Sequence, residues 1–304
     1  MTLAGLSACA PQPRAVVSLA RPSAPKETPT PHPAMTPDSA AIASYYDDLL
    51  ARMKARGLMR TDGGGPDAPY NARLLARNFL RIALFDEYAP GNDNPDKGSP
   101  TPDGLRRWAE PVRMALHFGA TVPADERRAD RAFVRDYIGR LSGLTGLQIT
   151  MGAEPANFHV MVVNEDERRV IGPEVERLIP GIDPRTVHAI ETMPLSTYCL
   201  VYTFTQPGRY TFTQALAVIR GEHPPLMRQA CYEEELAQGL GPANDSPEAR
   251  PSIFNDDQEY AFLTTQDALI LRMLYDPRLQ PGMTAEEAKP VVETLASELL
   301  DGHV

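Results

Sequence analysis

Apolar residues recur at helical spacing in several stretches of the chain. Between Asp38 and Met59 such residues lie three or four positions apart, Asp38 or Ser39 can cap the start, and Gly57 can end the helix. A second amphipathic stretch, Ala124 to Leu144, predicts a long helix that ends near Gly143 and Gly146. The first helix has Ile42, Tyr45, Tyr46, Leu49, Leu50 and Met53 at this spacing, and the second has Phe133, Val134, Tyr137, Ile138 and Leu141.

Short alternating or continuous apolar runs predict strands. They lie at Phe79–Tyr88, Leu105–Phe118, Leu147–Met151, Phe158–Val163, Tyr198–Thr205 and Tyr210–Ile219. Shorter helices are expected at Asn71–Ala76 and Gly172–Leu178, and further helices run from Pro225 to Gly241, from Leu263 to Tyr275 and from Ala285 to Leu300. We therefore expect an α+β fold with a mixed, mostly antiparallel sheet and packed helices.

Proline and glycine divide the chain into parts. Residues 10–37 contain eight prolines and few large apolar side chains, which is typical of an extended, disordered linker. The turn-rich stretch at 61–69 separates the helix at 38–60 from the remainder. We expect a single α+β domain over 70–304, preceded by a Pro-rich tether.

Composition and charge narrow the possible partners. The chain has 304 residues, of which 42% are hydrophobic and 23% charged, enough for a well-buried core. A formal net charge of −10 argues against a nucleic-acid partner, because phosphate binding needs a basic surface. No apolar run is long enough to predict a membrane-spanning helix.

Near the N-terminus, Leu6-Ser7-Ala8-Cys9 resembles the lipobox of bacterial lipoproteins. The resemblance implies acylation of Cys9 after signal cleavage, and hence a lipid-anchored protein on the periplasmic side of the bacterial cell envelope. The residues before Cys9 are short for a secretory signal and include no Lys or Arg. Either translation starts upstream of Met1, or the four-residue match is fortuitous.

The other two cysteines, Cys199 and Cys231, allow two interpretations. In an oxidising compartment they can form a disulfide, whereas otherwise both are buried free thiols. Neither lies in a Cys-x-x-Cys pair, so a redox or zinc-ribbon role is not expected.

The stretch from Cys231 to Leu274 carries the clearest candidate site. On a helix, Met227, Cys231, Glu234 and Gln238 form one line along the surface. The layout resembles the active-site segment of metzincin zinc proteases, which is His-Glu-x-x-His-x-x-Gly-x-x-His followed by a Met-turn and a helix. The resemblance implies a metzincin-like (zincin-like) architecture.

Residue by residue, the chemistry of that motif is missing. Glu234, Gln238 and Asn244 stand where the family has its three histidine ligands, Glu235 stands where it has the general base, and Gly241 matches the turning glycine. Asp245 lies beside the third ligand position, and Phe254 replaces the methionine in Ser252-Ile253-Phe254. Because zinc prefers imidazole or thiolate, we expect no metal, no cofactor and no confident catalytic residue.

Three alternatives remain for these positions. The first is a hydrogen-bonded helix face on a pseudoprotease, and the second is a weak site for a hard cation at Glu234, Asn244 and Asp245. The third is a metallohydrolase with unusual ligands and Glu235 as general base. The six histidines do not pair at i, i+4, and His223, just before the helix, is the one that could reach over Glu234.

Three segments, at 231–245, 252–256 and 274–283, also resemble a family of bacterial lipoproteins whose shared domain has no assigned function. This resemblance includes Glu234 and Gln238 as they stand, and implies location in the cell envelope. We therefore expect a non-catalytic binding or interaction module, with a membrane and an envelope protein or peptide ligand as partners.

Overall fold

The computed structural model describes residues 33–86, 101–102 and 104–301 of the chain. Cys9, the whole signal-like segment and most of the Pro-rich linker lie outside these residues. Residues His32–Val304 form one compact unit. None of the described helices is both long enough and apolar enough to cross a lipid bilayer.

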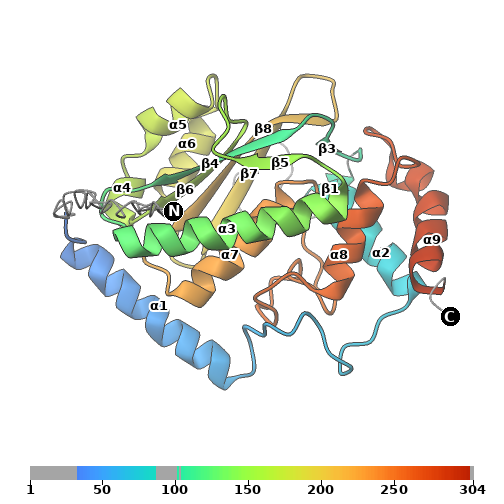
Figure 1. The fold of residues 1–304 in the computed structure, drawn as a ribbon, viewed down its shortest axis with the longest axis horizontal. Helices are drawn as coiled ribbons and strands as arrows, with labels where there is room; N and C mark the ends of the chain where they lie inside the picture. Colours follow the sequence, from blue (N-terminus) through green and yellow to red (C-terminus); the bar gives the residue numbers. More distant parts are fainter. Residues whose placement is uncertain (1–32, 87–100, 103, 302–304) are drawn as a thin grey trace, which may run out of the picture. The chain divides into compact units, whose positions relative to one another are not determined.

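Nine helices and eight strands follow one another in the described part of the chain (Figure 1). In order they are α1 (Pro37–Ala55), α2 (Ala72–Ala83), β1 (Phe85–Asp86), β2 (Thr101–Pro102), β3 (Arg107–Trp108), β4 (Val112–Phe118), α3 (Ala124–Thr145), β5 (Ile149–Met151), β6 (Phe158–Val163), α4 (Glu165–Arg168), α5 (Gly172–Leu178), α6 (Pro184–Glu191), β7 (Cys199–Thr205), β8 (Thr211–Arg220), α7 (Pro225–Gln238), α8 (Thr265–Leu274) and α9 (Ala285–Asp301).

The main sheet is parallel, with one antiparallel strand. β5, β4, β6 and β8 are neighbours in that order and all run parallel, while β7 pairs antiparallel with β8. The expected mostly antiparallel sheet is therefore wrong. The helix α3 lies between β4 and β5, and such a crossover returns the chain to the end of the sheet at which β4 began, so these two strands are parallel.

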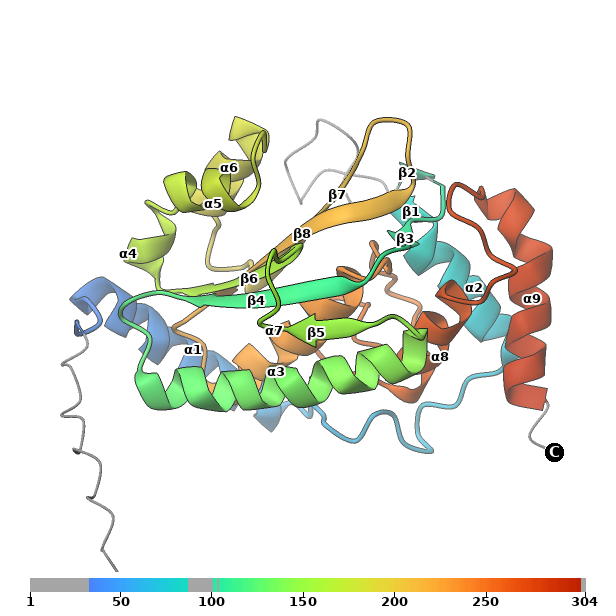
Figure 2. The ribbon, with the colours of Figure 1, turned by 45° about the horizontal axis from the view of Figure 1, so that its top comes forward.

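Each face of the sheet is covered by helices (Figure 2). On one face, side chains of β4, β6 and β8 pack with α3, α7 and α8 in the largest hydrophobic cluster. On the other face, Met161, Val163, Leu216 and Val218 pack with α5 and α6. A strand buried on both faces has apolar residues in succession rather than in alternation, and β6 is buried at all six positions and apolar at every one except His159.

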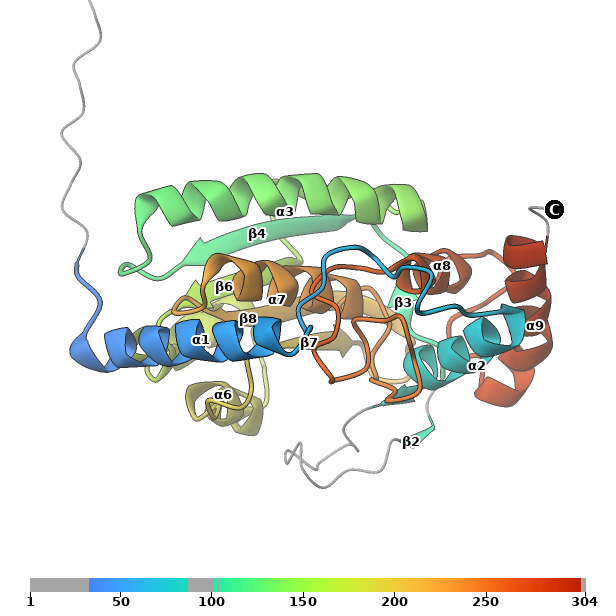
Figure 3. The same cartoon turned by 90° about the horizontal axis from the view of Figure 1, so that it is seen from below.

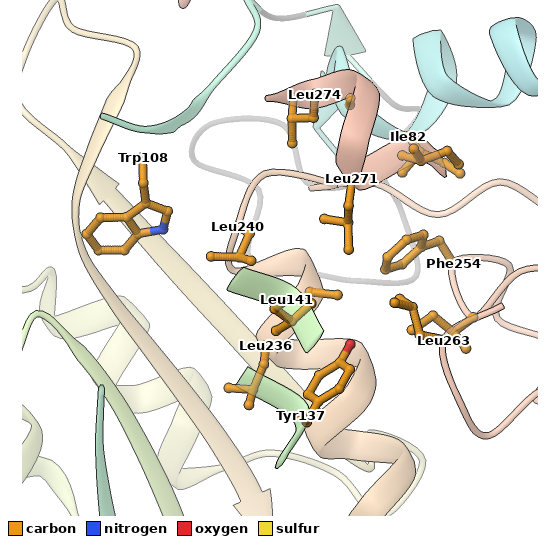
Figure 4. Packing of buried hydrophobic residues seen from close by; sticks show 14 of the residues in the cluster. Ile82, Trp108, Tyr137, Leu141, Leu236, Leu240, Phe254, Leu263, Leu271 and Leu274 are labelled. Carbon is orange, nitrogen blue, oxygen red and sulfur yellow. The ribbon is translucent and has the colours of Figure 1, made fainter. Parts of the chain in front are cut away.

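The larger cluster joins the sheet to the C-terminal helices. In Figure 4, Tyr137 and Leu141 of α3 gather with Leu236 of α7, Leu271 of α8 and Phe254. All five side chains are almost or fully buried. The position of α7 is therefore set by contacts with elements both before and after it in the sequence.

Most predicted elements agree with the structure, and two do not. The single strand expected at Leu105–Phe118 is divided into β3 and β4, with residues 109–111 between them. The strand expected at Phe79–Tyr88 is wrong, because Ala72–Ala83 is a single helix, α2, and β1 covers Phe85–Asp86 alone. Asn71 caps α2 by accepting a hydrogen bond from the Leu74 amide, 3.0 Å away. The four-residue α4 and the eight-residue α6 were not predicted.

The N-terminal helix α1 packs against α7 and does not stand apart. Figure 3 shows α1 alongside α7, and Tyr46 and Met53 share an apolar cluster with Met227. The cap of α1 is Thr36, whose side chain accepts from the Ser39 amide, so the helix begins slightly before the predicted start. After α1, the Met59 amide donates to the Gln258 carbonyl at 2.8 Å, so the chain also contacts a segment that follows α7.

A buried carboxylate, that of Glu233, fixes α7 to its neighbours. The Leu263 amide donates to its Oε2 at 3.0 Å, and Arg140 Nη1 lies 3.8 Å from the same oxygen. The Tyr137 hydroxyl donates to the Glu233 carbonyl at 2.6 Å. Burial raises the pKa of Glu233 to about 7, against the opposing effects of the Leu263 amide and Arg140.

The pKa of Glu233 makes stability depend on pH. Because the pKa rises from 4.5 to about 7 on folding, its contribution is full below pH 4.5 and is lost as the pH rises through 7. We expect Glu233→Gln to exceed the wild type in free energy of unfolding by about 2 kcal/mol at pH 8. The difference should shrink toward pH 5, as measured by urea unfolding across this range.

The exposed Glu248 provides the matched control, because Glu248→Gln removes a carboxylate from the surface. That variant should follow the wild-type curve at every pH. A Glu233→Gln variant whose difference from the wild type is the same at pH 5 and pH 8 would contradict the assignment.

Candidate functional site

The helix α7 is held from its start by a buried arginine. Arg228 Nε lies 2.9 Å from Asp130 Oδ2, and its Nη2 lies 3.0 Å from Glu126 Oε2, both on α3. Its Nη1 donates to the His223 carbonyl at 2.8 Å. Because Arg228 is itself buried, these bonds satisfy a charge that would otherwise be costly to place there.

The C-terminal end of α7 turns sharply where the sequence has Gly239 and Gly241. Trp108 Nε1 donates to the Gly239 carbonyl at 2.8 Å. Gly241 has φ of 137°, and a Cβ there would lie 2.7 Å from the Arg106 carbonyl oxygen and from a Leu274 methyl group. Gly241 is required both by its backbone conformation and by this close approach.

The polar residues at the motif positions have different environments. Glu235 is buried, whereas Glu234 and Gln238 are half-buried. Gln238 Nε2 donates to Asp245 Oδ1 at 3.1 Å, which ties the helix to the turn that follows. The ligand atoms of Glu234, Glu235 and Cys199 lie within 4.8 Å of one another, the one such group of three or more among the described His, Cys, Asp and Glu residues.

The sulfur atom in that group is already bonded. Cys199 and Cys231 form a disulfide that joins β7 to α7. The expected pairing of these two cysteines is therefore present in the structure. Two carboxylates remain in the group, and a disulfide sulfur is not the thiolate that zinc prefers.

Asn244 is used to hold the turn after α7. It is buried, its amide donates to the Ile82 carbonyl at 3.1 Å, and its Nδ2 donates to the Arg81 carbonyl at 2.9 Å. Both acceptors lie near the C-terminal end of α2. A neutral amide engaged in this way fixes α2 against the turn, a role that the sequence did not suggest.

Phe254 lies in the core beside a buried carboxylate. Asp267 on α8 accepts from the Ile253 amide at 3.0 Å and from the Thr264 amide at 2.9 Å. Ser252 Oγ lies 2.5 Å from the other carboxylate oxygen. Burial raises the pKa of Asp267, while these hydrogen bonds lower it. The segment at Ser252, Ile253 and Phe254 is thus fastened to α8.

His223 lies in an aromatic cluster beside the disulfide. Its ring centroid is 4.5 Å from that of Tyr46 and 6.1 Å from that of Tyr198, and its Nδ1 lies 3.7 Å from Cys231 Sγ. Burial lowers the pKa of His223 well below its usual value, so the ring is neutral at pH 7.

The segment after α1 closes over the disulfide. Met59, Gln258 and Glu234 line a small hollow together with Tyr198 and both cysteines. The backbone at Arg60 pairs with that at Tyr260 in a parallel bridge. The hollow is therefore bounded by α7, by β7 and by the segment at Met59 and Arg60, which follows α1 and is here called the strap.

His117 and His159, whose spacing in the sequence did not suggest a pair, lie next to each other on the main sheet. His117 Nε2 and His159 Nδ1 are 3.1 Å apart on the neighbouring strands β4 and β6. The available signal was the position of each histidine within a predicted strand, but strand order is needed to bring them together.

A family model described as "Protein of unknown function (DUF2927)" matches residues 72–294. The chain belongs to the DUF2927 family. No curated protein and no solved structure matches it. The DUF2927 match extends from α2 into α9, so α1 and the strap at Met59 and Arg60 precede it.

Within the DUF2927 domain, the disulfide supports a stability prediction. The bond closes a loop with a sequence separation of 32, which corresponds to about 3 to 4 kcal/mol in the chain-entropy model. We expect the Cys199→Ser, Cys231→Ser double variant to lose a free energy of unfolding of this size. Urea unfolding of oxidised and reduced protein provides the measurement.

Thiol labelling of the native, oxidised protein, followed by peptide mapping, is the independent check. Neither Cys199 nor Cys231 should be modified before a reductant is added. Modification of both in the untreated protein would rule out the disulfide.

Proposed function

We propose that the DUF2927 domain is a non-catalytic binding module of the bacterial cell envelope, which takes an extended peptide along the edge strand β7. The scaffold in this proposal resembles that of a zinc protease from which the metal ligands have been lost. The observation that carries the proposal is the position of β7 at the sheet edge, next to α7 and the disulfide.

The backbone of β7 supports peptide binding. Its seven residues pair with β8 along one edge, and among the described residues no strand pairs with its other edge. An edge of this kind offers alternating N–H and C=O groups, to which an extended peptide can add as a further strand. Those main-chain bonds supply affinity without requiring any metal.

Side chains near β7 support a preference among peptides. Glu234 and Cys199 line the hollow at the start of the strand, while Leu200, Tyr202 and Phe204 are only partly buried. Because Glu234 lies on the α7 face of β7, and Leu200, Tyr202 and Phe204 lie on the opposite face, an added strand would suit a peptide in which a basic residue alternates with apolar ones. The net charge of −10 favours the same class of ligand.

The metallohydrolase alternative has less support. Its general base would be Glu235, which is buried with 3% of its surface exposed, and the nearby sulfur is in a disulfide. A metal-activated water needs an open coordination position and a bound cation. These features favour the binding role over hydrolysis.

Hydrogen exchange tests the binding site. Peptides selected from a displayed random library on the purified protein should slow amide exchange in Cys199–Thr205, because outward amides become bonded to the peptide. The other edge strand of the sheet, β5, is the internal control and should exchange as before.

Three results would overturn the proposal. One is failure to enrich any peptide, and another is protection of β5 or of α5 and α6 in place of β7. The third is a peptidase activity of the wild type that Glu235→Gln abolishes, which would establish the hydrolase.

We further propose that acylated Cys9 anchors the protein to a membrane, with the Pro-rich stretch as a tether on the periplasmic side. The support is the Leu6-Ser7-Ala8-Cys9 pattern followed by a proline-rich segment. We expect Cys9→Ser to move the protein from the membrane fraction to the aqueous fraction, because a lipid chain supplies the membrane affinity. An unchanged distribution on cell fractionation would exclude the anchor.

A further inference from the structure

The imidazoles of His117 and His159 lie side by side on one face of the sheet. In the register of β4 and β6, His159 is opposite Ala115 and His117 is opposite Met161, so the two histidines are diagonal neighbours. His117 Nε2 and His159 Nδ1 are 3.1 Å apart, with ring planes inclined at 40°. This is the face that α5 and α6 cover, opposite α7.

Both rings are available as neutral ligands. His159 is buried and His117 is half-buried. Burial lowers the pKa of His159 to about 4, with His117 contributing further, and burial also lowers the pKa of His117.

A carboxylate lies within electrostatic reach of both rings. Glu174, near the start of α5, raises the pKa of each histidine, and each histidine lowers the pKa of Glu174. Arg177 holds this carboxylate through its Nε, 2.8 Å from Glu174 Oε2. Arg177 also engages the other oxygen, Glu174 Oε1, and the carboxylate does not lie at ligand distance from the paired nitrogens, so Glu174 contributes charge near the rings and not a bond to an ion.

We propose that His117 and His159 chelate one divalent transition-metal ion, with Glu174 as the neighbouring carboxylate. The site is separate from α7 and does not depend on the binding role of β7.

The distance between the two nitrogens agrees with chelation. With metal–nitrogen bonds of about 2.0 to 2.1 Å, two ligands on one ion lie about 2.9 Å apart at a right angle and about 3.4 Å apart in a tetrahedron. The observed 3.1 Å falls between these values. Imidazole ligands suit Cu²⁺, Ni²⁺ and Zn²⁺, whereas Mg²⁺ and Ca²⁺ prefer oxygen.

Binding the ion requires a definite arrangement of protons. Each ring must direct a lone pair at the metal, so the protons must lie on His117 Nδ1 and His159 Nε2. Without metal, one inner nitrogen carries the proton of the hydrogen bond between the rings. On binding, that proton moves through solvent to the outer nitrogen of its ring, so two neutral imidazoles take up the ion without net proton release.

The test is titration of the chelator-treated protein, made without a histidine tag, with Cu²⁺ and Zn²⁺ at pH 7. We expect one ion per chain at micromolar affinity, with Cu²⁺ tighter than Zn²⁺, and no detectable Mg²⁺ binding. His117→Gln and His159→Gln should each weaken Zn²⁺ binding at least tenfold. The exposed His188 provides the matched control, and His188→Gln should bind as the wild type does.

A second measurement uses the unaltered protein, in case either variant fails to fold. In nitrogen-15 spectra, Zn²⁺ should shift the imidazole signals of His117 and His159 and leave those of His188 in place. Unshifted signals for the pair, or equal Zn²⁺ affinity in the His117→Gln and wild-type proteins, would overturn the proposal and identify a structural hydrogen bond between the rings.

Discussion

The carboxylate of Asp267 has no access to solvent, and the arrangement around α7 depends on how that group is satisfied. Residues 251–264 contain no regular helix or strand, yet most of them are buried, with Asp256 and Asp257 exposed. Their amides at Ile253 and Thr264 would be costly to bury without acceptors, and Asp267 supplies an acceptor for both. Because these hydrogen bonds hold the segment to α8, Phe254 and Leu263 are fixed in the hydrophobic cluster in which α7 packs.

The polar residues of the candidate site also hold neighbouring segments together through hydrogen bonds. Asn244 satisfies the end of α2, Gln238 bonds to Asp245, and Glu233 accepts the Leu263 amide. In a metal centre, side chains at these turns would converge on an ion. Here several of them bond to backbone groups and to one another, which gives stability and a fixed shape. Such a site suits recognition of a ligand by shape and edge pairing more than activation of water.

The two faces of the sheet offer different chemistry. On the α7 face, carboxylates lie beside a disulfide, a strap from the N-terminal helix and an edge strand. On the α5 and α6 face, two neutral imidazoles lie within 3.1 Å of each other beside Glu174. The two imidazoles thus lie on the face away from Glu234 and Glu235. A metal there would stabilise the junction of β4, β6 and α5 and would not act on a peptide at β7.

Local patterns were sufficient for much of the secondary structure. The helices α3 and α5 and the strand β6 follow from periodicity and from glycine or proline at their ends, because these are properties of neighbouring residues. Of the two interpretations of Cys199 and Cys231, the disulfide is the one that the structure contains. The stretch at Phe79 failed because an apolar run fits a buried helix as well as a strand, and its packing against α9 decides between them.

Strand direction, strand order and the neighbours of each polar side chain were decided by the tertiary structure. His117 and His159 are far apart in sequence, and nothing near either residue indicates the other. The same holds for Asp267 with Ile253 and for Asn244 with the end of α2. The sequence by itself determined which residues can form each element and which chemical groups the chain contains. Which of these groups come into contact depends on the burial of apolar surface between segments that are distant in the sequence. The free energy of that burial is a property of the whole fold, so it cannot be read from any single stretch of sequence.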